Sequence, residues 1–191
     1  MKKIICVLLT LTMLTMACGA FAEPAPSVTL GAIVAPAGVT YAEDFAISMP
    51  AVVENTVQAA VIEEIVKFVE TEKVATYFGT EVMTSAKEYL PETLDVETLV
   101  VDEVFPLETA GYEAEYGDVE AVFEFVTTYE QGTTLLAMVG ILGEGETAEV
   151  TEWIPMPAEV VEDGKVKITF TQEALELLSA NQAVLALLRA E

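Results

Sequence analysis

Carboxylates are the main side chains of this sequence that could carry out chemistry. The chain has 32 acidic residues and no histidine, and its two cysteines, Cys6 and Cys18, both lie near the N-terminus. Without histidine it can form no Ser-His-Asp triad, no Cys-His pair and no histidine zinc site. The sequence also lacks the P-loop pattern and the Rossmann glycine pattern. These enzyme classes are therefore excluded, and we expect no cofactor.

Two carboxylates would suffice for glycoside hydrolysis if they lay roughly 5 to 10 Å apart. Glu120 and Glu124 share one face of a predicted strand, but four residues of strand span about 13 Å, which is too far. Glu152 has the same parity as Val150 and Ile154, so an inward-pointing carboxyl there could act as a general acid. The alternative is a strand-end residue whose carboxylate reaches solvent. We favour this alternative because an unpaired buried glutamate is rare.

Calcium binding needs only oxygen ligands, so the sequence has to be searched for a calcium loop. The chain has no loop of the EF-hand pattern, and its five aspartates are scattered: Asp44, Asp95, Asp102, Asp118 and Asp163. We therefore interpret the acidic residues as a solvated surface and expect no metal site.

Three aromatic residues are the candidate binding residues. Trp153, the one tryptophan, lies on the polar face of its predicted strand, and Tyr112 and Tyr116 lie in a loop between Gly111 and Gly117. Exposed aromatic side chains can stack on sugars or anchor a protein partner. The alternative is that Trp153 packs at the rim of the sheet and that the tyrosines hold their loop against it.

The N-terminus has the layout of a secretory signal. Lys2 and Lys3 precede an uncharged, mostly apolar stretch at 4–16, and Ala20-Phe21-Ala22 follows as a cleavage pattern. The apolar stretch is shorter than the roughly 20 residues of a membrane span, and no later stretch is long and apolar enough. Residues 1–22 are therefore predicted to be a signal peptide.

The fate of Cys18 leaves two locations open. We expect a secreted or extracellular protein with a short spacer at 23–27. However, residues 15–19 loosely resemble a bacterial lipobox, so the alternative is a lipoprotein anchored through Cys18.

Composition restricts both the partners and the means of stabilisation. Residues 23–191 carry six basic and 32 acidic residues, a net charge of −26. This charge repels nucleic acid and anionic lipid, so the expected partner is an extracellular glycan or protein. The same residues contain no cysteine, so the fold is stabilised by its core without disulfides.

Hydrophobic periodicity predicts an α+β fold, in which a mainly helical part at 28–95 precedes an antiparallel, β-sandwich-like meander at 96–191. We expect both parts to pack as one domain. In the first part we expect short strands at 28–34 and 39–47, and helices at 50–70 and 81–90. In the second part we expect strands at 98–105, 119–129, 133–142, 147–154, 158–161, 165–170 and 183–188, with one short helix at 172–179 before the last strand. Pro155 and Pro157 are predicted to end the strand at 147–154.

Together these patterns predict a non-catalytic extracellular binding or interaction module. The alternatives are a carboxylate-only glycoside hydrolase and a structural component of the cell envelope.

The position of cleavage is directly testable. We expect export to cut the chain after Ala22, so that mass spectrometry of the secreted product finds Glu23 at the N-terminus. A product that starts at a diacylglyceryl-modified Cys18 and is released only by detergent would instead establish the lipoprotein.

Overall fold

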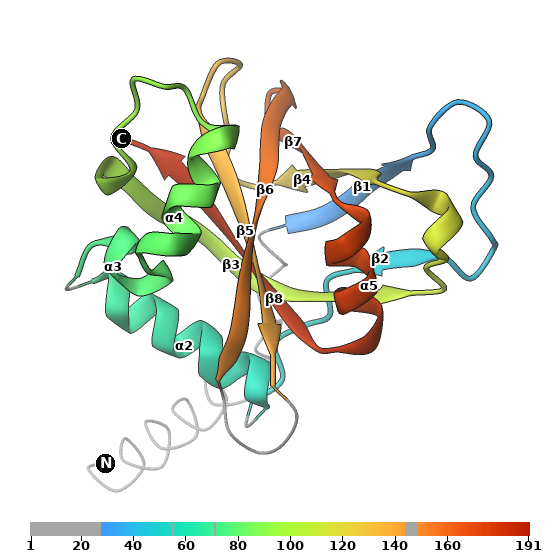
Figure 1. Cartoon of the computed structure of the whole chain (residues 1–191), viewed down its shortest axis with the longest axis horizontal. Coiled ribbons are helices and arrows are strands. Elements are labelled where there is room, and N and C mark those ends of the chain that lie inside the picture. Colours follow the sequence, from blue (N-terminus) through green and yellow to red (C-terminus); the bar gives the residue numbers. More distant parts are fainter. Residues whose placement is uncertain (1–27, 55, 71, 144–148) are drawn as a thin grey trace, which may run out of the picture.

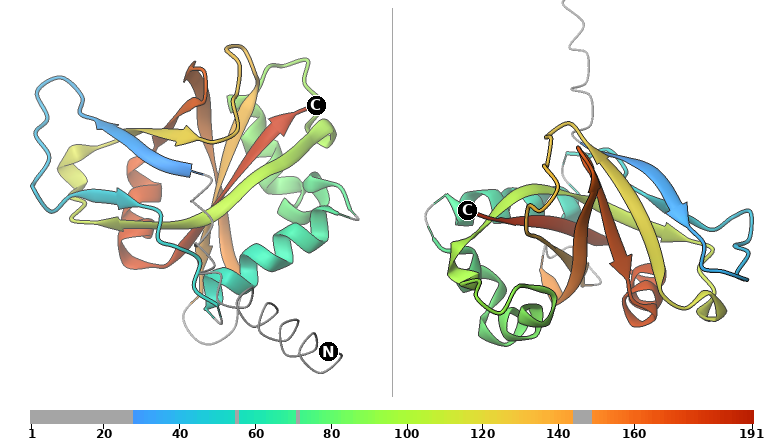
Figure 2. Two further views of the ribbon diagram at one scale, coloured as in Figure 1. Left: turned by 180° about the vertical axis from the view of Figure 1, so that it is seen from behind. Right: turned by 90° about the horizontal axis from the view of Figure 1, so that it is seen from above.

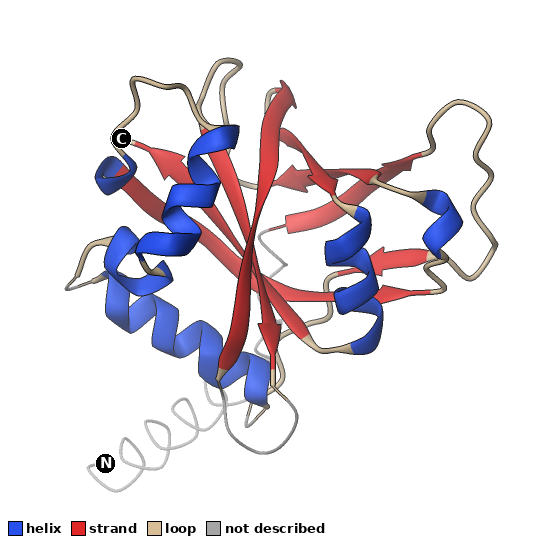
Figure 3. Ribbon diagram, viewed as in Figure 1, coloured by secondary structure: helices blue, strands red, loops and turns tan. Residues whose placement is uncertain are grey.

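The computed structural model describes residues 28–191 apart from 55, 71 and 144–148, so the predicted signal peptide and spacer lie outside the described residues. The described chain forms one eight-stranded sheet with short helices packed against it (Figures 1 and 3). Its strands are β1 (Val28–Val34), β2 (Ala46–Ser48), β3 (Leu99–Ala110), β4 (Val119–Phe125), β5 (Leu135–Leu142), β6 (Val150–Glu162), β7 (Lys165–Phe170) and β8 (Ala183–Ala190). Its helices are α2 (Val57–Val69), α3 (Val74–Phe78), α4 (Thr80–Ala86) and α5 (Gln172–Ala180), with 3-10 turns η1 (Lys87–Tyr89), η2 (Val96–Thr98) and η3 (Ala114–Tyr116).

The predicted fold class, a mainly helical part followed by a β-sandwich-like meander, is wrong both in the order of its elements and in the arrangement of its strands. The strand order is β1-β4-β7-β6-β5-β8-β3-β2, every neighbouring pair is antiparallel, and the edge strands β1 and β2 approach each other. The sheet therefore curves until it nearly closes on itself, instead of forming a sandwich (Figure 2). Within the described residues, two strands precede the helices, and these strands, β1 and β2, join the sheet through β4 and β3. Local periodicity does not contain such long-range pairing, so the sequence could not supply it.

The pair β5 and β8 lies at the centre of the hydrophobic core. All eight residues of β5 and the first six of β8 are buried, as expected for central strands whose sequences are apolar on both faces. Side chains of β5 alternate between two layers, because successive residues of a strand point to opposite faces. Ala137 and Val139 face the enclosed core of the curved sheet, whereas Leu136 and Met138 face α3 and α4.

Helix α5 fills the enclosed core. Ala174, Leu175 and Leu178 are buried there together with the inward side chains of the strands. The helix begins where predicted, since the Thr171 side chain accepts a hydrogen bond from the Ala174 N–H at 3.3 Å. Such an N-cap typically contributes about 1 kcal/mol.

Helices α2, α3 and α4 cover the outer face of the central strands, on the side of β6 opposite to α5 (Figures 1 and 2). Helix α2 begins at Val57, later than the predicted 50, because the Thr56 side chain caps it by accepting from the Ala59 N–H at 3.2 Å. Val61 and Ile65 form its buried stripe, whereas Val53, which the predicted helix at 50–70 included, lies before the helix and is exposed.

The outer face of β4, β7 and the last part of β6, from Ala158 onward, has no such helical cover in the described chain and is lined by ion pairs. The Lys167 Nζ lies 3.3 Å from carboxylates of both Glu120 and Glu159. The Lys165 Nζ lies 2.8 Å from Glu162 and 3.9 Å from Glu124. The inward side chains of β4 are buried, as its alternating pattern predicts.

Pro155 and Pro157 do not end a strand, which corrects the prediction. Strand β6 runs through both of them, because its pairing with β7 begins only at Ala158 while its pairing with β5 begins at Val150. Before Ala158, β6 has a strand neighbour on one side only within the described part of the chain. Proline is tolerated at such an edge because its missing N–H breaks no ladder bond.

Gly140 and Trp153 form a cross-strand pair whose packing can be tested. A Cβ placed on Gly140 would lie 2.7 Å from Cη2 and Cζ3 of Trp153, whose ring is held against α3. We therefore expect Gly140→Ala to lower the free energy of unfolding by about 1–3 kcal/mol in chemical denaturation.

Gly31→Ala is the matched control in another strand. Its new Cβ would meet the exposed Glu124 side chain at 3.1 Å, which can move away, and the Val122 carbonyl oxygen at 3.3 Å. Both contacts are longer than the 2.7 Å contacts at Gly140, so we expect a smaller loss. A loss at Gly31 equal to or larger than that at Gly140 would contradict this account of the Trp153 packing.

Candidate functional site

The structure brings Tyr112 and Tyr116 together, at 6.0 Å between ring centroids, in a cluster that also contains Tyr41 and Phe45. The Tyr112 hydroxyl binds the backbone of its own loop, whereas the Tyr116 hydroxyl binds the backbone of the loop between β1 and β2. The Tyr112 hydroxyl donates to the Gly117 carbonyl oxygen and the Tyr116 hydroxyl accepts from the Ala42 N–H, each at 3.0 Å. Tyr116 is buried and Tyr112 half-buried, so both tyrosines hold loops in place.

Trp153 lies elsewhere, under the helical layer. Its ring packs edge-on against Phe78 at 4.7 Å and Tyr77 at 6.1 Å between centroids, and it is half-buried. The structure thus places Trp153 on the other face of the sheet from the two tyrosines, in a different hydrophobic cluster. The three predicted binding residues do not form one patch.

The carboxylates considered for catalysis also lie apart. Glu152 is exposed, as expected for a residue whose carboxylate reaches solvent, and Glu120 and Glu124 are ion-paired to lysines. Among the described residues, no group of three or more carboxylates is placed to hold a metal ion.

One pair of glutamates does converge, on the exposed loop around η3. The pKa of Glu113 is raised, first because its carboxyl hydrogen-bonds Glu115 and further by the negative charges of Glu115 and Asp44. Carboxyls at hydrogen-bonding distance are closer than the roughly 5 Å that separates the two groups of a retaining glycosidase. We therefore interpret Glu113 and Glu115 as neighbouring carboxylates on a densely charged surface and not as a catalytic pair.

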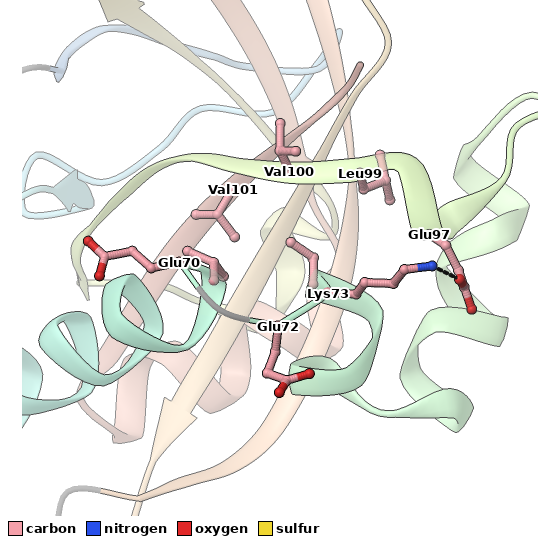
Figure 4. A pocket seen from close by; sticks show the side chains of 9 residues that line it. Glu70, Glu72, Lys73, Glu97, Leu99, Val100 and Val101 are labelled. Carbon is pink, nitrogen blue, oxygen red and sulfur yellow. Dashed lines mark hydrogen bonds and ion pairs between the residues drawn. The ribbon is translucent and has the colours of Figure 1, made fainter.

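A pocket of about 410 Å³ provides a better candidate site, which sequence reasoning missed (Figure 4). It lies where α2 ends, α3 begins and β3 emerges from η2. Its walls combine aliphatic side chains with four charged ones: Val69, Val74, Leu99, Val100 and Val101, and Glu70, Glu72, Lys73 and Glu97.

Local capping positions the charged residues of this pocket. Lys73 is the extended residue that precedes α3, and the Asp95 side chain starts η2 by accepting from the Glu97 N–H at 3.0 Å. Lys73 and Glu97 then form an exposed ion pair across the pocket. The hydrogen bond to Glu97 and its negative charge raise the pKa of Lys73.

The pocket therefore has a net negative rim. Lys73 compensates one of the three glutamates, while the exposed Glu70 and Glu72 extend from the end of α2 and from the segment before α3. No signal in the sequence joins Lys73 to Glu97, because they are 24 residues apart and neither belongs to a motif.

The comparisons with known proteins give no relative from which to transfer a site: no protein-family model, curated protein or solved structure matches this chain. Among the described residues, no helix is both long and apolar enough to cross a membrane.

Tyr77, which packs on Trp153, gives a test of this buried aromatic layer. Burial, with a smaller contribution from the Glu64 charge, raises the pKa of Tyr77 from 10.0 to about 12. Between pH 10 and about 12, Tyr77 therefore keeps its phenol proton in the folded protein but loses it in the unfolded chain. The stability due to Tyr77 is full below pH 10 and should be lost as the pH rises toward 12.

Chemical denaturation of the wild type and Tyr77→Phe between pH 9 and about 12 measures this loss. We expect the free energy of unfolding to fall less steeply with pH in the variant. Equal slopes in the two proteins would contradict the burial of this phenol.

Proposed function

We propose that this chain is a non-catalytic extracellular binding module, and that the pocket between α2, α3 and β3 holds a cationic, partly aliphatic ligand. The observation that carries the proposal is the composition of this pocket, whose aliphatic walls have Glu70 and Glu72 at the outer margin, with their carboxylates pointing outward (Figure 4). A ligand with an amine or guanidinium on an alkyl stem matches both parts, because the stem can cover valine and leucine while the charge stays at the rim.

The charge of the whole protein supports this choice of ligand. Five of the six basic residues after residue 22 are ion-paired, namely Lys67, Lys73, Lys165, Lys167 and Arg189, so a large excess of carboxylates remains uncompensated. Such a field attracts cations and repels acidic ligands, and it acts mainly on the rate of association. The signal-like pattern of the N-terminal sequence supports the extracellular part of this proposal.

NMR titration of the full exported chain with N-acetyl-lysine methylamide tests the proposal. We expect chemical-shift changes centred on Val74, Leu99 and Val101. The uncharged N-acetyl-norleucine methylamide should produce much weaker ones. Binding should weaken with added salt, because exposed charges are screened.

Matched charge variants locate the site. In E70Q/E72Q we expect the Kd for the lysine probe to rise roughly five-fold, since each exposed ion pair contributes about 0.2–1 kcal/mol. The control E130Q/E152Q removes the same charge at exposed residues away from the pocket, and its Kd should stay close to that of the wild type.

Two results would overturn the proposal. Equal weakening in both double variants would show attraction to the overall charge without a site. Cleavage of a glycoside by the wild type, lost in E70Q/E72Q, would replace the binding module by the carboxylate-only hydrolase.

A further inference from the structure

The pocket borders an open edge of the sheet. Strand β3 pairs with β8 along Leu99–Ala190 to Leu107–Ala183, but β2 covers its other side only at Glu108, Thr109 and Ala110. Among the described residues, 99–107 therefore have a strand neighbour on one side only. Figure 4 shows the start of this strand crossing the pocket, with Val101 on the pocket side of the ribbon.

Register fixes which backbone groups face the opening. The Glu191 N–H donates to the Thr98 carbonyl oxygen at 3.3 Å, and in an antiparallel pair such bonded positions alternate. Val100 therefore turns its backbone groups toward Arg189 of β8, whereas Val101 turns its N–H and C=O toward the open side. An exposed strand edge of this kind is a template for an incoming strand.

We propose that the ligand of this module is a basic peptide that adds as a short extended strand to β3 beside Val101 and places a Lys or Arg side chain in the pocket. This inference rests on the proposed function and specifies its partner. Main-chain hydrogen bonds to the strand edge would supply affinity, and the pocket would supply selectivity for a cationic side chain.

Charge selects this occupant over a second copy of the chain. Two copies would bring together two molecules that each carry −26 over residues 23–191, and Glu70 and Glu72 would face further carboxylates. The same repulsion disfavours an acidic peptide.

The strand itself limits the length of the added segment. The register of β3 with β8 shifts between Val101 and Glu103, which marks a bulge at Asp102, and Pro106 lacks an N–H. Only the stretch before the bulge offers a regular edge. The partner therefore contacts β3 over about three residues, which corresponds to roughly 10 Å of strand.

The probe is the blocked peptide acetyl-Lys-Val-Lys-Val-Lys-amide, used with the full exported chain. Two methylated versions of it carry N-methyl groups on the valines alone or on the lysines alone. Alternate residues of a strand turn their N–H groups to opposite sides. We therefore expect one version to bind roughly ten-fold or more weakly and the other to bind like the parent peptide.

Hydrogen exchange gives a second readout on the protein side. Binding of the parent peptide should slow exchange at the Val101 amide, and E70Q/E72Q should weaken peptide binding while E130Q/E152Q should not. Strand addition would be overturned if both methylated peptides bound with the same affinity. It would also be overturned if the parent peptide did not slow hydrogen exchange at the Val101 amide.

The outcomes separate this inference from the proposed function. Suppose that the lysine probe binds at the pocket, but that the peptide binds no more tightly than this probe or that its two methylated versions bind equally well. Strand addition is then wrong, whereas the proposed binding module remains supported. If neither probe depends on Glu70 and Glu72, both are wrong. Concentration-dependent self-association that blocks the peptide would assign the edge to a second copy instead.

Discussion

The structure depends on the burial of β5 and β8 on both faces. Leu136 and Met138 project from one face of β5, and Ala137 and Val139 from the other, so each face of the sheet needs an apolar cover there. Burial of the larger of these side chains, those of leucine, methionine and valine, contributes roughly 1.5–3 kcal/mol each, so an exposed face at this position would be strongly unfavourable. The enclosed core filled by α5 covers one face, and α2, α3 and α4 cover the other.

The positions of the polar face and of the pocket follow from where the layer formed by α2, α3 and α4 ends. Beyond the helical layer, the outer face of β4, β7 and the last part of β6 is polar and is crossed by ion pairs around Lys165 and Lys167. On the opposite side, the helical layer stops beside the open edge of β3, and the turn from α2 into α3 leaves the pocket with Glu70 and Glu72 at its rim. The candidate site is thus a consequence of how far the helices extend over the sheet.

The sequence by itself determined several of the local elements and excluded the chemistry that requires histidine. The strand at 28–34, the N-cap Thr171 and the end of α3 at Gly79, whose φ is 84°, could all be read from neighbouring residues. The inward alternation of β4 and the two-sided apolarity of β5 were equally readable, because burial on a strand follows a period of two. The absence of histidine excludes whole enzyme classes in any fold.

Only the tertiary structure decided how these elements assemble and where a ligand site forms. It placed β1 beside β4 and ran β6 through Pro155 and Pro157, since a proline is acceptable where the partner strand has not yet begun. It put Trp153 under a helix, although the parity of its own strand marks that face as polar. The pocket joins Lys73 to Glu97 and both to the edge of β3. Such contacts depend on the packing of segments distant in the chain, which no local pattern records.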